Sequence, residues 1–472
     1  MTEETERYQA VQGINTLSEL ALNQELISDF FRTVTIKIKI SPLNEGDSIS
    51  RTFDNDHAQQ YTITGISVVE DEKSKNSPVY NDVVQIVEML SERICAIDIN
   101  QKITELIEIN TKYAKLKEDL EELLKNNKTS IFNSEWSVFY LLKELFQCIK
   151  EKIKRTAYYR GQSENWEAIP GVIRPGVDKS YALEFEEIYH NLAFEFENIE
   201  YIRLEQNMSL ECQEKRAQNI ALLQHFNLLT PYVDITSNEF IAMFFMIDSA
   251  KIKNPCIDIL FQSEDKDDNK QSLVQKAPTS HQNVRLSAQK GSFLNFEKVL
   301  VNDSITRIDR IRVTIDYDVR SHFLIMEQEK DDLGNNAKET QGLESIILET
   351  NGDEVEIERQ LAEKVSRSGK KLQELLREAE TDQDNKIINN DKIHAAFVEN
   401  FEYGQKLTEL KKNRDKLFSN LKDEIERKLE EFRYTSAEIY PDLPNRLSSI
   451  KTKYSNQSSR NLKQTVKIDK IQ

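Results

Sequence analysis

The stretch YYRGQSENWEAIPGVIRP, residues 158–175, decides our interpretation of this chain. It opens with a strand-like run, Ala157–Tyr159, that passes directly into Arg160, Gly161 and Gln162. Glycine has no Cβ, so the backbone at Gly161 can turn or approach another group closely. An arginine at a strand end presents a rigid fork of donors that suits a phosphate or a carboxylate. A structural salt bridge beside a turn is the alternative role for Arg160.

The composition limits the class of protein. The chain has 472 residues, of which 38% are hydrophobic and 31% charged, with only 12 glycines and 9 prolines. This length predicts two or three structural units, and the shortage of turn-forming residues favours helix. The net charge of −18 argues against a general nucleic-acid binder, because phosphate contacts need an excess of Lys and Arg.

Missing patterns exclude several kinds of site and location. Cysteines 95, 148, 212 and 256 have no CxxC spacing, which predicts buried, reduced thiols. The histidines form no HxxxH or HExxH pattern, so we expect no metal site. The acidic N-terminus lacks the apolar segment of a signal peptide, and no apolar run is long enough to span a membrane. We therefore expect a cytoplasmic protein.

Residue periodicity places the strands and helices. Val34, Ile36, Ile38 and Ile40 alternate with polar residues, as in a half-exposed strand that we expect to pair with a second strand at 61–69. Further strands are predicted at 157–159, 231–235, 255–261, 285–288 and 311–317, and helices at 181–204, 216–226, 239–250 and 410–432. Residues 263–281 are predicted to form a charged loop. The pattern as a whole predicts an α+β fold, with a small mixed β-sheet core and long helices.

The same pattern suggests an order of units along the chain. The predicted units are an N-terminal α+β accessory domain (1–100), a helical linker (101–130), a core (131–325), an acidic helical insertion (326–404), a C-terminal helix that completes the core (405–452) and a flexible tail (453–472).

Polar side chains gather at the ends of the predicted core strands. They are Arg160 with Gln162, Asp234 with Thr236, and Arg285 with Gln289, and His225 lies near them in sequence. If these groups meet in one cleft, two arginines and nearby aromatic rings would suit an anionic nucleotide. Tyr158, Tyr159 and Phe293 are the expected stacking rings. His225 can equally be a core histidine with a satisfied ring.

Further motifs stand in a recognisable order. QHFNLLTPYVDIT (224–236), NVRLSAQKGSFLNF (283–296) and IYPDL (439–443) follow YRGQ (159–162) and IRP (173–175). This order resembles the FRG domain family, named for its (F/Y)RG motif, over roughly 130–327 and 405–452. The chain departs from the family pattern at Asn227, where the family usually has Gly, at Pro231–Val233, and at Ile235, which replaces Trp.

The resemblance implies an ADP-ribosyltransferase-like fold with NAD as the ligand. It implies Arg160, Thr236, Gln289 and His225 as catalytic residues, and Arg160, Gly161, Gln162, Gln224, Asp234 and Arg285 as cofactor-binding residues. By order along the chain, Arg160 would hold the NAD phosphates and Thr236 the nicotinamide end. Gln289 is the candidate for the late position that steers the acceptor, with Glu327 or Glu329 as alternatives.

Two functional hypotheses follow. The first, implied by the resemblance, is a bacterial toxin or phage-defence effector that cleaves NAD or transfers ADP-ribose to a macromolecule. The second is a non-catalytic module that binds a nucleotide or a regulatory partner protein. A nuclease is disfavoured because no cluster of Asp and Glu suggests a metal site.

Overall fold

A computed structural model describes most of the chain outside its ends and several connecting segments. The described residues are 14, 16–43, 60–94, 136–206, 208–262, 271–276, 284–301, 305–322, 346–347, 349–350, 353–381 and 386–441. The predicted linker (101–130), Glu327, Glu329, Cys95 and the tail (453–472) lie outside these residues.

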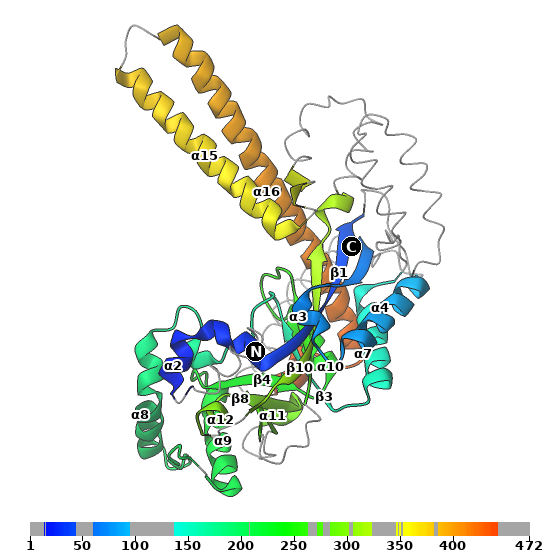
Figure 1. The fold of residues 1–472 in the computed structure, drawn as a ribbon, viewed down its shortest axis with the longest axis vertical. Helices are drawn as coiled ribbons and strands as arrows, with labels where there is room; N and C mark the ends of the chain where they lie inside the picture. Colours follow the sequence, from blue (N-terminus) through cyan, green and yellow to red (C-terminus); the bar gives the residue numbers. More distant parts are fainter. Residues whose placement is uncertain are drawn as a thin grey trace, which may run out of the picture.

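One eight-stranded mixed sheet forms the centre of the molecule (Figure 1). Its strand order is β2-β1-β10-β5-β3-β4-β8-β7. The bounds are β1 Phe31–Pro42, β2 Tyr61–Val68, β3 Ala157–Gln162, β4 Tyr232–Thr236, β5 Cys256–Phe261, β7 Val274–Lys276, β8 Gly291–Asn295 and β10 Ile308–Tyr317. The pair β1–β10 is parallel and the other neighbours are antiparallel. The predicted α+β class is therefore confirmed.

Helices cover both faces of this sheet. One hydrophobic cluster packs α4 (Tyr80–Ile94), α7 (Val138–Ile153), α10 (Glu239–Ile247) and part of α16 (Lys386–Glu431) on one face. A second cluster packs α2 (Leu17–Leu22), α8 (Lys179–Glu195), α9 (Leu210–His225) and α12 (Glu297–Val301) on the other. Two 3-10 helices, η1 (Gln24–Phe30) and η3 (Gly171–Ile173), join the second cluster.

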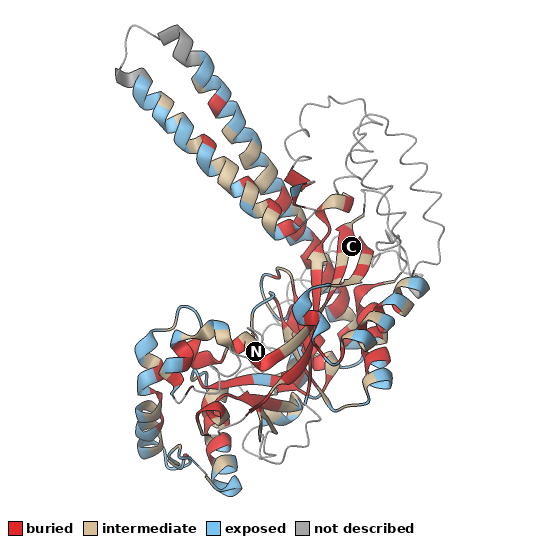
Figure 2. Ribbon diagram, viewed as in Figure 1, coloured by how far each residue is buried: buried red, intermediate tan, exposed pale blue. Residues whose placement is uncertain are grey.

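The strands follow the period of two that their sequences predict. Successive side chains of β3 point to opposite faces, and Tyr159 belongs to the first cluster while Tyr158 belongs to the second. In β5, Ile259 and Leu260 divide in the same way. Figure 2 shows the resulting buried sheet between its helical layers.

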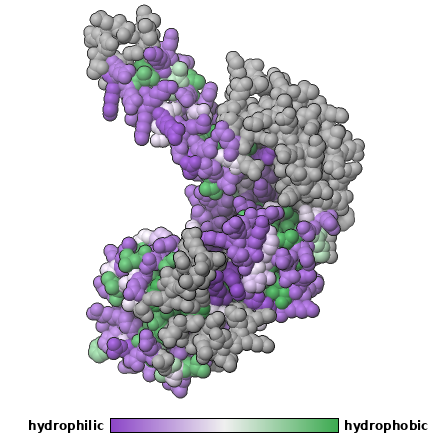
Figure 3. Space-filling view, in the orientation of Figure 1, coloured by the Kyte–Doolittle hydropathy of each residue, from purple (hydrophilic) through white to green (hydrophobic). Residues whose placement is uncertain are grey.

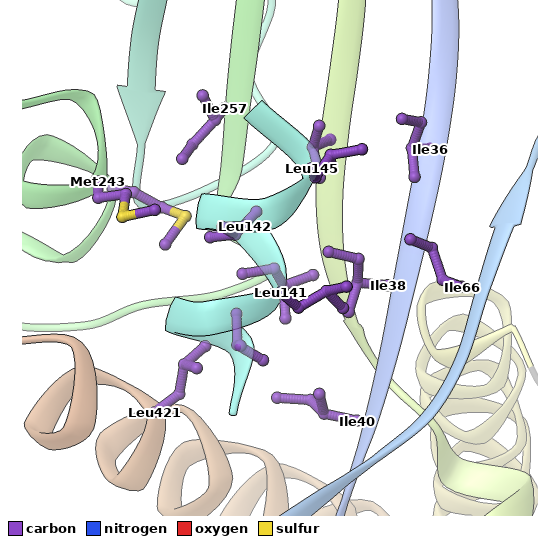
Figure 4. Packing of buried hydrophobic residues seen from close by; sticks show 14 of the residues in the cluster. Ile36, Ile38, Ile40, Ile66, Leu141, Leu142, Leu145, Met243, Ile257 and Leu421 are labelled. Carbon is purple, nitrogen blue, oxygen red and sulfur yellow. The ribbon is translucent and has the colours of Figure 1, made fainter. Parts of the chain in front are cut away.

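The two N-terminal strands belong to the central sheet. The predicted pairing of β1 with β2 is confirmed, but β1 also pairs with β10 from Phe31↔Ile308 to Ile40↔Tyr317. Ile36, Ile38 and Ile40 are fully buried and pack near Leu141, Leu142 and Leu145 of α7 (Figure 4). The strands expected in a separate accessory domain thus extend the core sheet, because their apolar face needs the helix layer that covers the core strands.

Several local predictions were wrong. Residues 284–288 form helix α11 (Val284–Ala288), and the strand there is β8, which begins at Gly291. Lys290 at φ 45° turns the chain between the two, so a run too short to show its period was misassigned. The predicted helix at 181–204 ends at Glu195 in α8. The predicted loop at 263–281 contains β7 and the short strand β6 (Gln271–Ser272), which pairs with β9 (Ile305–Thr306).

The cysteines also differ in part from expectation. Cys148 and Cys256 are buried and reduced, as predicted, whereas Cys212 is reduced but exposed, because it lies on the outer side of the first turn of α9. Within the described segments, no helix is both long and apolar enough to cross a membrane.

A helical arm projects from the sheet (Figure 1). It consists of α15 (Glu354–Thr381) and the first part of α16. The predicted C-terminal helix is confirmed, and it continues without a break from the region predicted as an insertion. Leu417, Leu421 and Ile425, in the later part of α16, are buried in the core, whereas the arm surface is mostly hydrophilic (Figure 3).

A buried carboxyl group lies at the base of the arm. Glu354 is 4% exposed and accepts a hydrogen bond from Arg414 at 3.0 Å. Burial raises the pKa of Glu354 to about 7, even though Arg414 favours its charged form and Lys253 lies nearby. Arg414 is shared with Glu358 at 2.6 Å, and the charge of Glu358 adds to the rise in the pKa of Glu354.

The raised pKa of Glu354 predicts that its contribution to the free energy of unfolding falls with rising pH. A carboxyl group whose pKa is raised on folding favours folding while it is protonated, and this contribution is lost as pH rises from about 4.5 through about 7. We expect Glu354→Gln to match the wild type at about pH 4 and to exceed it at pH 8 by up to about 3 kcal/mol in urea unfolding. Glu356→Gln is the control, because the pKa of Glu356 is lowered to about 2 by Arg359. Equal pH profiles for Glu354→Gln and the wild type would contradict the prediction.

Candidate functional site

Arg160 lies in the middle of the sheet, on β3 between β5 and β4. It shares a face with Tyr158 and Gln162, because residues two apart on a strand point the same way. Its Nη1 donates to the backbone oxygen of Asp234 at 2.7 Å, and its Nε donates to Oε1 of Gln162 at 3.2 Å. Both bonds orient the guanidinium, and Nη2 has no hydrogen-bond partner among the described residues.

A cleft of about 910 Å³ opens at this face of the sheet. The nine residues predicted for the site all line it: Arg160, Gly161, Gln162, Gln224, His225, Asp234, Thr236, Arg285 and Gln289. They come from β3, the end of α9, β4, and α11 with the turn after it. The structure therefore brings the predicted residues together, while the roles assigned to them stay predictions.

Asp234 is held by the end of α9. The Asp234 side chain is exposed and accepts a hydrogen bond from Nε2 of Gln224 at 2.7 Å. The Thr230 hydroxyl donates to the Oε1 of the same glutamine. His225, the last residue of α9, is half-buried and packs its ring edge-on against Phe226.

Thr236 and Gln289 make structural bonds. The Thr236 hydroxyl donates to the Gln289 carbonyl at 2.7 Å and accepts from the Asn238 amide at 3.1 Å, at the start of α10. Gln289 donates through Nε2 to the carbonyl of Ile439 at 3.3 Å, in the short helix α17 (Ser436–Ile439). Both side chains thus tie β4 and α17 to the turn before β8, and the Thr236 hydroxyl and the Nε2 of Gln289 already have partners.

Gly161 serves packing as well as the cleft. An added Cβ there would lie 1.7 Å from the carbonyl oxygen of Ala242 and 2.7 Å from the amide nitrogen of Met246, both in α10. The close approach that the sequence suggested therefore occurs, and it occurs between β3 and α10.

Residues 155–254 match the family model of the FRG domain. The chain contains an FRG domain. The match runs from the start of β3 through α10, a shorter span than the resemblance suggested. No curated protein and no solved structure matches the chain.

The cleft extends beyond the matched FRG residues. Arg285, Gln289 and Tyr440 line it from later segments, and Tyr440 places its ring 4.6 Å from the guanidinium carbon of Arg285. Tyr440 also donates its hydroxyl to Asp248, at the end of α10. The FRG domain thus provides one wall, and α11, β8 and the end of the described chain provide another.

Three arginines line the cleft without an acidic partner. Arg160, Arg174 and Arg285 form no ion pair with any residue that the structure describes, whereas Arg216, Arg310, Arg312 and Arg414 all do. Desolvation lowers the pKa of Arg160, the charge of Asp234 opposes this, and the charge of Arg174 adds to the lowering. Two like charges close enough to interact favour an anion between them.

Sequence reasoning missed several cleft residues and misjudged others. Arg174, Trp166 and Asp248 line the cleft but were not among the predicted site residues. The first two belong to the stretch 158–175, so their signal was present, but local patterns could not show which way the side chains point. The predicted stacking rings Tyr158, Tyr159 and Phe293 are 5%, 1% and 2% exposed, so packing in the two hydrophobic clusters leaves them no free ring face.

The cleft offers no obvious metal centre. Among the residues the structure describes, no group of three or more His, Cys, Asp or Glu side chains could hold a metal ion. Its carboxylates are Glu167, Asp234 and Asp248. Glu167 is engaged with Arg310 at 2.6 Å and with Arg312 at 3.5 Å, so Asp234 and Asp248 are the two without an arginine partner.

Proposed function

We propose that the cleft of this FRG domain binds the pyrophosphate of a nucleotide, and that the nucleotide is NAD. The observation that carries the proposal is the group of three arginines without acidic partners in one cleft. Arginine forks bind phosphate oxygens through paired, charge-assisted hydrogen bonds. Arg160 is already oriented by two hydrogen bonds, so little side-chain freedom would be lost on binding.

The reaction in this proposal is transfer or hydrolysis of ADP-ribose. The bond from C1′ of the nicotinamide ribose to the ring nitrogen breaks, and nicotinamide leaves with the bonding pair. The ribose cation that develops needs a nearby negative charge. Asp248 and Asp234 are the carboxylates that could supply it, since Gln289 has no charge and bonds to Ile439. Water or a macromolecular acceptor then bonds to C1′ and gives up a proton.

The biological setting completes the proposal. An NAD-consuming or ADP-ribosylating activity in the cytoplasm would suit a bacterial toxin or phage-defence effector. The support for this part is the family resemblance alone.

A non-catalytic binding module is the second candidate. The specific observation in its favour is that Thr236 and Gln289, expected at catalytic positions, use the Thr236 hydroxyl and the Gln289 Nε2 for structural hydrogen bonds. Such a domain would bind the nucleotide, or a regulatory partner, without breaking it.

Binding is the first test of the proposed function. We expect calorimetry to show NAD or ADP-ribose binding to the full chain, weakened about 10- to 100-fold in Arg160→Gln, because a charged hydrogen-bond donor is lost. Arg367→Gln is the control, since Arg367 is 81% exposed on the arm. Absence of binding by the wild type, or equal affinity in Arg160→Gln, would overturn the proposal.

Turnover then separates the two candidates. Nicotinamide release by the wild type, lost in Asp248→Asn, is the result expected of an enzyme. Asparagine can still accept the hydrogen bond from Tyr440, so this variant removes the charge and keeps the contact. Binding without release of nicotinamide would favour the non-catalytic module.

A further inference from the structure

Trp166 is an exposed tryptophan on the wall of the cleft. Its side chain belongs to the loop between β3 and η3, and it is 53% exposed. Tryptophan is usually highly buried, because its ring buries more apolar surface than almost any other side chain. Exposure of this ring in the cleft is therefore a feature that needs a reason.

The backbone of Trp166 is held in place by side chains of the sheet. Its carbonyl accepts hydrogen bonds from Nε2 of Gln162 at 2.9 Å and from Nη2 of Arg312 at 3.2 Å. Its amide donates to the carbonyl of Glu164 at 2.8 Å. Arg312 also donates to Oδ1 of Asn165 at 3.2 Å. The loop is thus anchored at Asn165 and at the backbone of Trp166.

Arg312 is itself locked by a buried ion pair. Asp258 is fully buried and accepts from Arg312 at 2.7 and 2.8 Å. Burial is the largest single influence on the pKa of Asp258 and would raise it, but the charges of Arg312 and Arg310 and the hydrogen bonds from Arg312 together outweigh burial, so the pKa is lowered. A buried pair of this kind orients more than it stabilises, and what it orients here is the loop that carries Trp166.

The other rings in the cleft are in use. Tyr159 and Phe293 are buried in the core. Tyr440 has Arg285 against its ring and packs on Phe245. Trp166 is therefore the most exposed of the aromatic rings that line the cleft.

Arg174, which follows Trp166 in the same stretch of chain, also lines the cleft. Arg174 donates through Nε to the carbonyl of Ile169 at 3.2 Å, in the same loop as Trp166. Its terminal nitrogens have no other partner among the described residues. An aromatic face and a free guanidinium in one cleft match a ligand with a planar ring and a phosphate.

We propose that Trp166 is the stacking platform for the planar base of the ligand, and that it makes the cleft selective for nucleotides over other anions. This inference rests on the proposed function and adds the part of the ligand that the arginines cannot recognise. Stacking on tryptophan tolerates different rings, because every base has a π face. The test therefore compares ADP-ribose, which carries adenine, with nicotinamide mononucleotide, which carries nicotinamide.

The chain offers a direct readout. It has two tryptophans, and Trp136 packs against the hydrophobic cluster on the other face of the sheet. Trp136→Phe leaves Trp166 as the only indole fluorophore. We expect ADP-ribose or nicotinamide mononucleotide to quench its emission, and ribose 5-phosphate and inorganic pyrophosphate to bind with little quenching. The ligand that quenches identifies the ring that stacks.

Affinities provide the second arm. Trp166→Ala should bind the quenching nucleotide about 5- to 150-fold more weakly and leave the affinity for pyrophosphate unchanged, while Trp166→Phe should recover most of the loss. Because the ring is exposed, both variants should keep the wild-type melting temperature. Equal weakening for pyrophosphate and nucleotide, or none for either, would overturn the stacking role and leave the anion site standing. Failure of every ligand to bind the wild type would overturn both proposals.

Discussion

Gly161→Ala is expected to destabilise the fold by more than about 4 kcal/mol, a large fraction of the stability of an ordinary domain. The added Cβ would lie 1.7 Å from the carbonyl oxygen of Ala242, well inside van der Waals contact. Neither β3 nor α10 can move away at a low cost in free energy. The strand β3 is hydrogen-bonded on both edges, to β5 and to β4, and α10 is buried over most of its length.

The measurement is urea unfolding followed by circular dichroism. Gly404→Ala is the matched control, because a Cβ there meets no atom within 4 Å in the arm helix. Alanine is the better helix former, so that variant should gain about 0.5–1 kcal/mol. A Gly161→Ala chain that unfolds at the same urea concentration as the wild type would show that α10 can move away at little cost. The glycine of the FRG motif would then need another explanation.

Arg216→Met is expected to cost about 3–5 kcal/mol, because it leaves a buried carboxylate without its partner. Arg216 is 2% exposed and donates hydrogen bonds to two glutamates. Glu297 accepts from it at 2.6 and 3.1 Å, and Glu186 accepts at 2.7 and 3.0 Å. These bonds join α9 to α8 and α12. The side chain of Glu297 is 3% exposed, so solvent cannot replace the lost arginine.

The arm provides a matched control for this experiment. Arg359 also bridges two glutamates, Glu356 and Glu363, but its side chain is 54% exposed. Exposed ion pairs contribute little to stability, so Arg359→Met should unfold at nearly the same urea concentration as the wild type in the same assay. Adding Glu297→Gln to Arg216→Met should recover part of the loss, because it removes the stranded charge. Similar losses for both arginines would mean that burial does not set the strength of the Arg216 network.

Local pattern predicted the strands well and the connections poorly. The strands β1, β2, β5 and β10 were found because alternating or continuous β-branched residues mark them over several positions. The run at 284–288 is only five residues long, so it shows neither period clearly. No local pattern could show that β1 belongs to the core sheet. Its partner β10 is the last strand of that sheet along the chain, whereas β1 is the first.

For the candidate site, too, local pattern predicted some features and not others. The polar residues of the cleft were recognised because they follow strand ends and belong to motifs in order. Which of them are free was not recognisable. Arg160 and Arg174 keep unpaired donors, whereas Thr236 and Gln289 use theirs on carbonyls from other segments. The exposed ring of Trp166 was not singled out for the same reason, and the rings that were named, Tyr158, Tyr159 and Phe293, are buried.

The sequence by itself determined the class of fold, the positions of the main strands and the presence of an FRG domain, since each depends on residues close together in the chain. Only the tertiary structure decided which donors are unpaired, which ring is exposed and that β1 completes the core sheet. Whether a donor is paired or a ring is buried depends on which other segment folding places next to it. In this chain those neighbours come from segments far apart, as Gln289 and Ile439 show.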